Sequence, residues 1–243
     1  MKLIALTIAL LLPVVPSEKI PAGTVIPVML SSRLNGKDKP DESIEGKVMQ
    51  EVTLPSGIKI REGTRVLGHT VSASKGKSGS SIVVKFTAIQ DDNHKVPVTV
   101  GALAIASMAN VSDAHRPVGG NSDMDPDTQW VTRQVGGDVV RRGWGQVFSS
   151  GGLTGKWVGG SSVVMRLTPN EAAGCSAGPG YDREQALWVF SSTACGTYGL
   201  GKIKIVNSGA ASHVGEITLT SSRDIDIRGG SGWLLIVAED SSQ

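Results

Sequence analysis

The chain has 243 residues, with 24 lysines and arginines against 22 aspartates and glutamates, so its formal net charge is +2. Charged residues make up only 19% of the sequence and the basic pairs are scattered, which argues against a binding surface for DNA, RNA or an anionic membrane. Glycine is abundant, at 31 residues, and favours short strands joined by tight turns over helices.

The first 17 residues have the pattern of a cleavable secretory signal. Met1 and Lys2 precede the apolar run Leu3–Leu12, and the small residue Ser17 follows a Pro-Val segment. The apolar run is too short to span a bilayer, which takes about 20 apolar residues, and no later segment reaches that length. We therefore expect a mature protein without a transmembrane helix, either secreted or in the periplasm of a cell envelope.

Residues 18–107 predict a series of β-strands with turn residues between them. The polar residues 91–94 predict a hairpin turn, and Ser74–Ser80 predicts a flexible hairpin connection. Strands are expected at residues 24–30, 46–52, 58–60, 65–73, 82–89 and 95–100.

The composition changes near residue 108, after which the chain is rich in glycine and tryptophan. Asn110–Thr128 predicts a loop or linker, and Gly136–Gly160 predicts irregular loops or edge strands. The last segments, 216–219, 224–227 and 233–238, are similar in style to the first half and are expected to complete its sheet. Residues 18–107 and 216–243 would then form one β scaffold, with 108–215 as an insertion. Within the insertion, strands are expected at 129–135, 163–167, 186–191 and 202–206.

The fold class that these patterns indicate is all-β, a mainly antiparallel barrel or sandwich with a Gly/Trp-rich β insertion. Cys175 and Cys195 are the two cysteines of the chain, and behind an export signal such a pair predicts a disulfide within the insertion. Closing a loop of about 20 residues would contribute roughly 3 kcal/mol in the chain-entropy view. The alternative is two separate buried thiols.

Three segments, Ile20–Leu30, Gly46–Val48 and Ile60–Gly68, together resemble the TrbI-like family of channel-scaffold proteins of type IV secretion and conjugation systems. The resemblance implies the β-barrel fold of that family's periplasmic domain. The family also carries a membrane helix and a proline-rich arm, and its insertion is an apolar helical hairpin that lines a pore. Residues 108–215 contain no comparable apolar helix, which argues against a channel role.

Over most of its length the chain also resembles a group of uncharacterised secreted bacterial proteins, especially of acidobacteria. Two stretches carry this second resemblance, Trp130–Asp138, which reads Trp-x-x-Arg-Gln-x-Gly-Gly-Asp, and Ala186–Ser191 ahead of Cys195. It implies export and brings no assigned activity.

Motifs for catalysis or metal binding are weak. Gly151–Lys156 departs from a phosphate loop, because Trp157 stands where a Ser or Thr must bind magnesium. The alternating oxygen side chains of Asn121–Asp127 indicate either a solvated acidic loop or a calcium site. No metal site or cofactor is therefore assigned. The histidines lack both metal-ligand spacing and a nucleophile motif, and each is interpreted as a structural side chain: His69, His94, His115 and His213.

The tryptophans are the remaining signal for function. Trp144 lies between two glycines and, together with Trp157, is a candidate platform on which a ligand could stack. The alternative is that these rings fill the core of a domain poor in other large apolar residues. Trp188, inside the apolar run Ala-Leu-Trp-Val-Phe, is predicted to be a core residue.

Together these observations favour a non-catalytic secreted or cell-envelope binding or structural module, whose partner is an envelope polymer or protein. One alternative is a component of an envelope or secretion channel assembly, which follows from the TrbI-like resemblance. Another is a hydrolase acting on envelope polymers. The sequence indicates no ligand identity and no oligomeric state.

Overall fold

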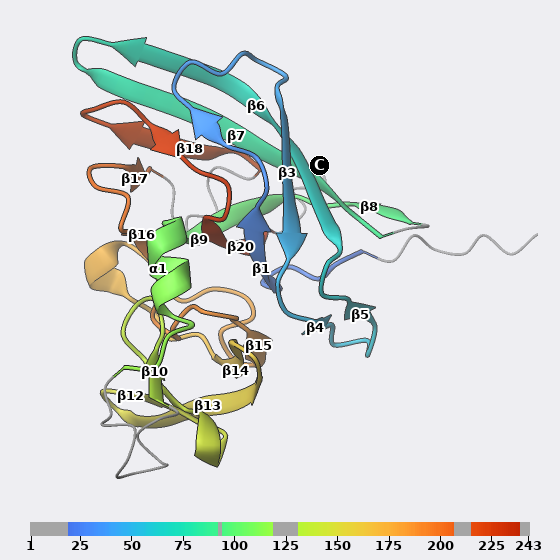
Figure 1. Ribbon diagram of the computed structural model, residues 1–243. Helices are drawn as coiled ribbons and strands as arrows, with labels where there is room; N and C mark the ends of the chain where they lie inside the picture. Colours follow the sequence, from blue (N-terminus) through green and yellow to red (C-terminus); the bar gives the residue numbers. More distant parts are fainter. Residues whose placement is uncertain (1–18, 92–93, 119–130, 207–214, 239–243) are drawn as a thin grey trace, which may run out of the picture.

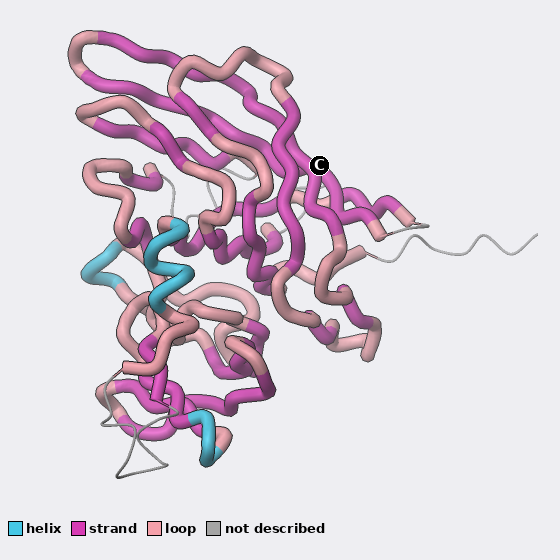
Figure 2. The backbone as a smooth tube through the Cα atoms, in the orientation of Figure 1, coloured by secondary structure: helices cyan, strands magenta, loops and turns pink. Residues whose placement is uncertain are grey.

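The computed structural model describes residues 19–91, 94–118, 131–206 and 215–238, and the predicted leader lies outside these ranges. About 51% of the described residues are in strands and about 6% in helices, and strands predominate along the backbone (Figure 2). This confirms the all-β class. Two sheets account for most of the structure: a ten-stranded scaffold sheet and a six-stranded inserted sheet (Figure 1).

The scaffold sheet has the strand order β16-β9-β20-β1-β3-β6-β7-β18-β17, and β8 is attached to β7. Its neighbours are antiparallel except for β16 and β9. The two edge strands approach each other, because the Thr197 hydroxyl of β16 donates to the Ile203 carbonyl at 2.7 Å, just before β17. The sheet is therefore nearly closed. Its strands are β1 (Val25–Leu30), β3 (Ser43–Val48), β6 (Arg65–Gly76), β7 (Gly79–Gln90), β8 (Lys95–Pro97), β9 (Val100–Ala106), β16 (Gly196–Tyr198), β17 (Lys204–Ile205), β18 (Ile217–Ser221) and β20 (Gly232–Val237).

Strands β6 and β7 form the long hairpin at the top of Figure 1. The hairpin connection expected within Ser74–Ser80 is confirmed, but it is shorter than expected, because the strands pair as far as Gly76 and Gly79. The polar residues there are compatible with a strand because the hairpin projects into solvent. Residues 95–100, expected as one strand, are divided between β8 and β9. The hairpin between β7 and β8 is confirmed.

The C-terminal strands return to the first half of the chain. β20 lies between β1 and β9, and β18 pairs with β7. The scaffold sheet also takes β16 and β17 from within 108–215, so the expected insertion contributes to it. Two short ribbons flank the sheet, β2 (Leu34–Asn35) with β19 (Asp226–Ile227) and β4 (Val52–Thr53) with β5 (Lys59–Ile60).

The inserted sheet is an antiparallel meander in chain order, at the bottom of Figure 1. The expectation of irregular loops or edge strands over Gly136–Gly160 is therefore wrong, since three of the strands in this range lie inside the sheet. Many of its glycines have positive φ angles at hairpin ends, and Gly155 allows close strand packing because a Cβ there would lie 2.3 Å from Met165 Cβ. The strands are β10 (Val131–Arg133), β11 (Val139–Arg141), β12 (Gln146–Ser149), β13 (Gly152–Gly159), β14 (Ser162–Arg166) and β15 (Glu184–Ala186).

The described helices are short. α1 (Met108–Asp113) begins after Ser107, whose hydroxyl accepts the Asn110 N–H at 3.2 Å, so the loop expected at 110–128 begins inside a helix. Residues 119–130 lie outside the described ranges. Two 3-10 turns, η2 (Arg142–Trp144) and η3 (Glu171–Ala173), lie in the insertion.

The strand expected at Ala186–Ser191 is also wrong. β15 ends at Ala186, and the next residues make a buried turn in which the Phe190 N–H donates to the Leu187 carbonyl at 2.9 Å. The backbone of Trp188 is bonded by side chains instead of a strand ladder: its N–H donates to Gln50 Oε1 and its carbonyl accepts from Gln134 Nε2. A continuous apolar run cannot distinguish such a turn from a buried strand.

Two buried clusters stabilise the fold. The first fills the scaffold and includes Phe86 and Trp233, whose rings meet edge to face at 5.8 Å. The second lies between the inserted sheet and the outer side of β1, β9 and β20. Trp188 belongs to this second cluster and is 3% exposed, which confirms its predicted core position.

Candidate functional site

Among the described residues, the inserted sheet has one covered face and one open face. On β12, Val147 is fully buried in the second cluster, whereas Phe148 points to the opposite side. Cross-strand partners share a face, so Leu153, which pairs with Phe148, lies on that same side and is 62% exposed. We call the side that carries Phe148 and Leu153 the outer face.

Trp144 is held at one end of the outer face. The 3-10 turn η2 places its ring outside the core, where it is 54% exposed. The Arg141 guanidinium lies 5.0 Å from the centre of this ring and 5.2 Å from the ring of Phe148. A cation between two aromatic rings is attracted by both, so the three side chains form a stack that fixes the position of Trp144.

The turn itself is fixed by backbone hydrogen bonds. Gly145 ends η2 with a φ of 67°, a left-handed conformation that favours glycine, and its N–H donates to the Arg142 carbonyl. The Trp157 N–H donates to the Gly145 carbonyl at 3.0 Å. Burial lowers the pKa of the half-buried Arg142 guanidinium, and its Nε finds no hydrogen-bond partner within the described structure.

The Trp157 side chain lies on the opposite, covered face of the inserted sheet. It pairs with the fully buried Val163, and its ring packs against the second cluster while its Nε1 donates to the Gly160 carbonyl at 3.1 Å. The structure therefore does not bring Trp144 and Trp157 together into one platform. The sequence analysis missed Arg141 and Phe148 as the partners of Trp144, because it expected irregular loops or edge strands in this segment and no pairing between β11 and β12.

The outer face is basic. Arg141 and Lys156 both pair with Gln146 from either side, so a row of three residues crosses β11, β12 and β13. The six inserted strands contain four exposed cations, Arg133, Arg141, Lys156 and Arg166, and a single carboxylate, Glu184.

Elsewhere on the surface, several cations are paired with carboxylates. Arg33 binds Asp226 through two hydrogen bonds of 2.6 and 2.7 Å, and these bonds hold the pKa of that carboxyl below its usual value. Arg65 and Glu45 form a similar pair, which lowers the pKa of Glu45. None of the four cations of the outer face makes such an ion pair with a described carboxylate.

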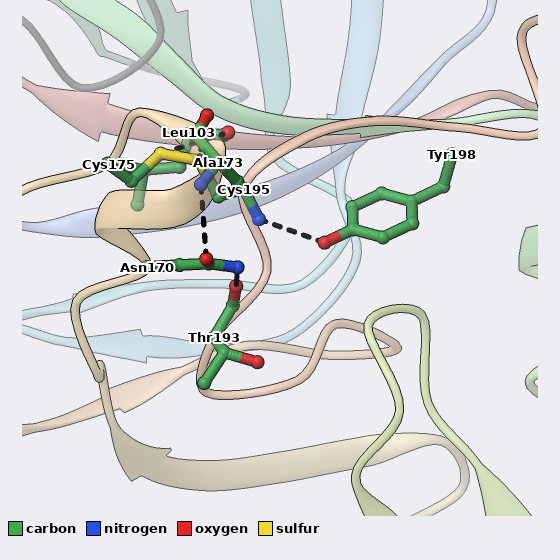
Figure 3. The surroundings of a disulfide bond; sticks show 7 residues. All are labelled: Leu103, Asn170, Ala173, Cys175, Thr193, Cys195 and Tyr198. Atoms are coloured by element: carbon green, nitrogen blue, oxygen red, sulfur yellow. Dashed lines mark hydrogen bonds between the residues drawn. A yellow bond between two sulfur atoms is a disulfide. The ribbon is translucent and has the colours of Figure 1, made fainter.

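The predicted disulfide is confirmed (Figure 3). Cys175 and Cys195 are joined with their Cα atoms 6.1 Å apart, and both are buried. Asn170 anchors the loop, because it exchanges backbone hydrogen bonds with Cys175 and its Nδ2 donates to the Thr193 carbonyl at 3.1 Å. The Tyr198 hydroxyl accepts the Cys195 N–H at 3.0 Å. The bond thus ties η3 to the start of β16, a structural role.

A pocket of about 520 Å³ lies apart from the outer face, between residues 19–22, β7, β8 and the end of β20. Its walls are mostly aliphatic and threonine side chains, with Lys19 and Lys85 as its cations. These segments lie far apart in the sequence, so no motif indicated the pocket.

The described part of the chain contains no group of three His, Cys, Asp or Glu side chains placed to hold a metal ion. The acidic stretch Asn121–Asp127, considered as a calcium site, lies outside the described ranges, as do Trp130 and His213. Within the described ranges, none of the helices has the length and apolar character that a membrane span requires.

Comparison with known proteins found no matching family model, no matching curated protein and no matching solved structure. The resemblance to the TrbI-like family therefore stays a prediction. Any inference about function rests on the outer face of the inserted sheet and on the residues around Trp144.

Proposed function

We propose that the protein is a non-catalytic binding module of the cell envelope or the extracellular space, and that the outer face of the inserted sheet contacts its ligand. The observation that carries the proposal is the exposed ring of Trp144, stacked on Arg141. Tryptophan is favoured at the centre of binding surfaces because it offers a large flat area with few rotatable bonds.

The stack supports this proposal through preorganisation. Arg141 lies between Trp144 and Phe148, so the ring is already ordered in the free protein and loses little conformational freedom on binding. Leu153 and Val158, at 62% and 57% exposed, extend the apolar area along β13. Neighbouring exposed apolar groups of this kind are typical of interaction sites.

The location is part of the proposal. A disulfide persists in oxidising compartments and is rare in the cytosol, so the Cys175–Cys195 bond favours an exported protein. The signal pattern of residues 1–17 supports the same location. Polymers of the cell envelope are then the most accessible ligands.

The test is co-sedimentation of the purified protein with peptidoglycan sacculi and with polysaccharide beads. Trp144→Ala should weaken the affinity about thirtyfold, since removing a central tryptophan contact commonly costs about 2 kcal/mol. Ile58→Ala is the matched control, because Ile58 is also an exposed apolar residue, at 45%, but lies outside the inserted sheet. Failure of the wild type to bind any polymer, or equal binding by Trp144→Ala, would refute the proposal.

A further inference from the structure

The charges of the outer face indicate the chemistry of the ligand. We infer that this face binds an anionic polysaccharide, a chain of sugar rings that carries carboxylate groups. The inference rests on the proposed function and specifies its ligand class.

The cations of the outer face are arranged around the aromatic stack. Arg141 and Lys156 flank Gln146 across three adjacent strands, which places their Cα atoms about 10 Å apart at the usual strand spacing. In the neighbouring row, Arg133 pairs with Val139, and Val139 pairs with Phe148. Basic groups therefore lie on both sides of the aromatic and apolar strip rather than in one cluster.

These cations make no ion pair with another described residue. Arg33 and Arg65 of the scaffold each bind a carboxylate through two hydrogen bonds. In the described structure, Arg141 contacts aromatic rings, and none of the four outer-face cations makes an ion pair with a carboxylate, although Glu184 on β15 lies opposite Arg166. Within the described residues their hydrogen-bond donors meet no carboxylate in an ion pair and can bind an external anion, and an arginine fork matches a carboxylate in both shape and charge.

The shape of the outer face fits a polymer better than a small molecule. The outer face is an open sheet surface, whereas small ligands are usually enclosed in concave pockets, and the 520 Å³ pocket lies elsewhere. An extended polymer can contact Trp144 with the flat side of a sugar ring while its carboxylates reach Lys156 and Arg166. The net charge of only +2 makes nucleic acid the less favoured polyanion.

The experiment compares polygalacturonate with its fully methyl-esterified form, which has the same backbone without the charges. We expect polygalacturonate to bind about tenfold more tightly and to lose affinity as salt is raised, because exposed charges are screened. Lys156→Gln/Arg166→Gln leaves the Trp144 stack intact and should weaken binding about tenfold. Lys37→Gln/Lys39→Gln removes the same charge from an exposed scaffold loop and should stay within about twofold of the wild type.

The outcomes separate this inference from the proposed function. Equal, salt-independent binding of the two polymers, still lost in Trp144→Ala, would overturn the anionic ligand and leave the binding module standing. Tighter binding of single-stranded DNA than of polygalacturonate would also overturn it. An equal loss of affinity in the Lys37→Gln/Lys39→Gln control would also overturn it, because binding would then depend on net charge and not on the outer face. Absence of binding to any polymer would refute both.

Discussion

At the scale of single residues, buried glutamines join the insertion to the scaffold. Gln50, 4% exposed, accepts the Trp188 N–H at 2.7 Å and donates to the Val163 carbonyl at 2.8 Å. Gln185 donates to the Gly23 and Gly180 carbonyls and accepts the Val25 N–H at 3.0 Å. An amide side chain can satisfy donors and acceptors together, so each glutamine replaces strand pairing between the two sheets.

We predict that Gln185→Leu destabilises the protein by about 2–4 kcal/mol. The substitution is similar in size but leaves the Val25 N–H and the Gly23 carbonyl without their partner in a buried position, and each such group costs about 1–3 kcal/mol. Urea unfolding followed by circular dichroism measures the loss. Gln146→Leu, on the open outer face, is the control and should change stability by less than about 0.5 kcal/mol. A similar stability for Gln185→Leu and the control would contradict this role.

The candidate site was only partly predictable from residues. The glycines on both sides of Trp144 correctly suggest a turn at the surface, because neither neighbour of the ring in the sequence has a side chain that could cover it. Phe148 and Arg141 come together through strand pairing between β11 and β12, which depends on the register of the hairpin. No local pattern shows which face a short strand presents, so the stack could not be derived from sequence.

At the scale of elements, alternation and turn residues predict the simple strands well. The expected strands at 24–30 and 65–73 correspond to β1 and β6, because their β-branched residues lie on buried positions of a pleated sheet. The same reasoning failed at Gly136–Gly160. There the glycines sit at hairpin ends or under a close neighbour such as Met165, and local composition does not distinguish this from an irregular loop.

We predict that Cys175→Ser/Cys195→Ser lowers the free energy of unfolding by about 3 kcal/mol. The bond closes a segment of 20 residues, and without it the unfolded chain gains conformational freedom. The measurement is urea unfolding of the variant and of the wild type with and without reductant. Reduction should shift the wild type to the midpoint of the double variant. An unchanged midpoint would show that the hydrogen bonds of Asn170 and Tyr198 hold the loop by themselves.

At the scale of the whole molecule, the two buried clusters share three strands of the scaffold sheet. β1, β9 and β20 contribute alternate side chains to the two clusters: Ile26 and Leu235 to the first, Val25 and Leu234 to the second. Because both faces of these strands are buried, they read as continuous apolar runs, which is the pattern of a central strand. The insertion therefore cannot separate from the scaffold without exposing one face of these strands.

Because both clusters contain side chains from the same three strands, we predict that the molecule unfolds cooperatively. Leu234 and Leu235 are adjacent in β20, both are fully buried, and they point into opposite clusters. Leu234→Ala and Leu235→Ala should each lower stability by about 3 kcal/mol, since each removes a large side chain from a packed core. Calorimetry of either variant should show one transition at a lower temperature, because loss of either cluster uncovers the strands that support the other. Two independent domains would behave differently: Leu234→Ala would split off an early transition of the insertion, while the scaffold would melt at its original temperature.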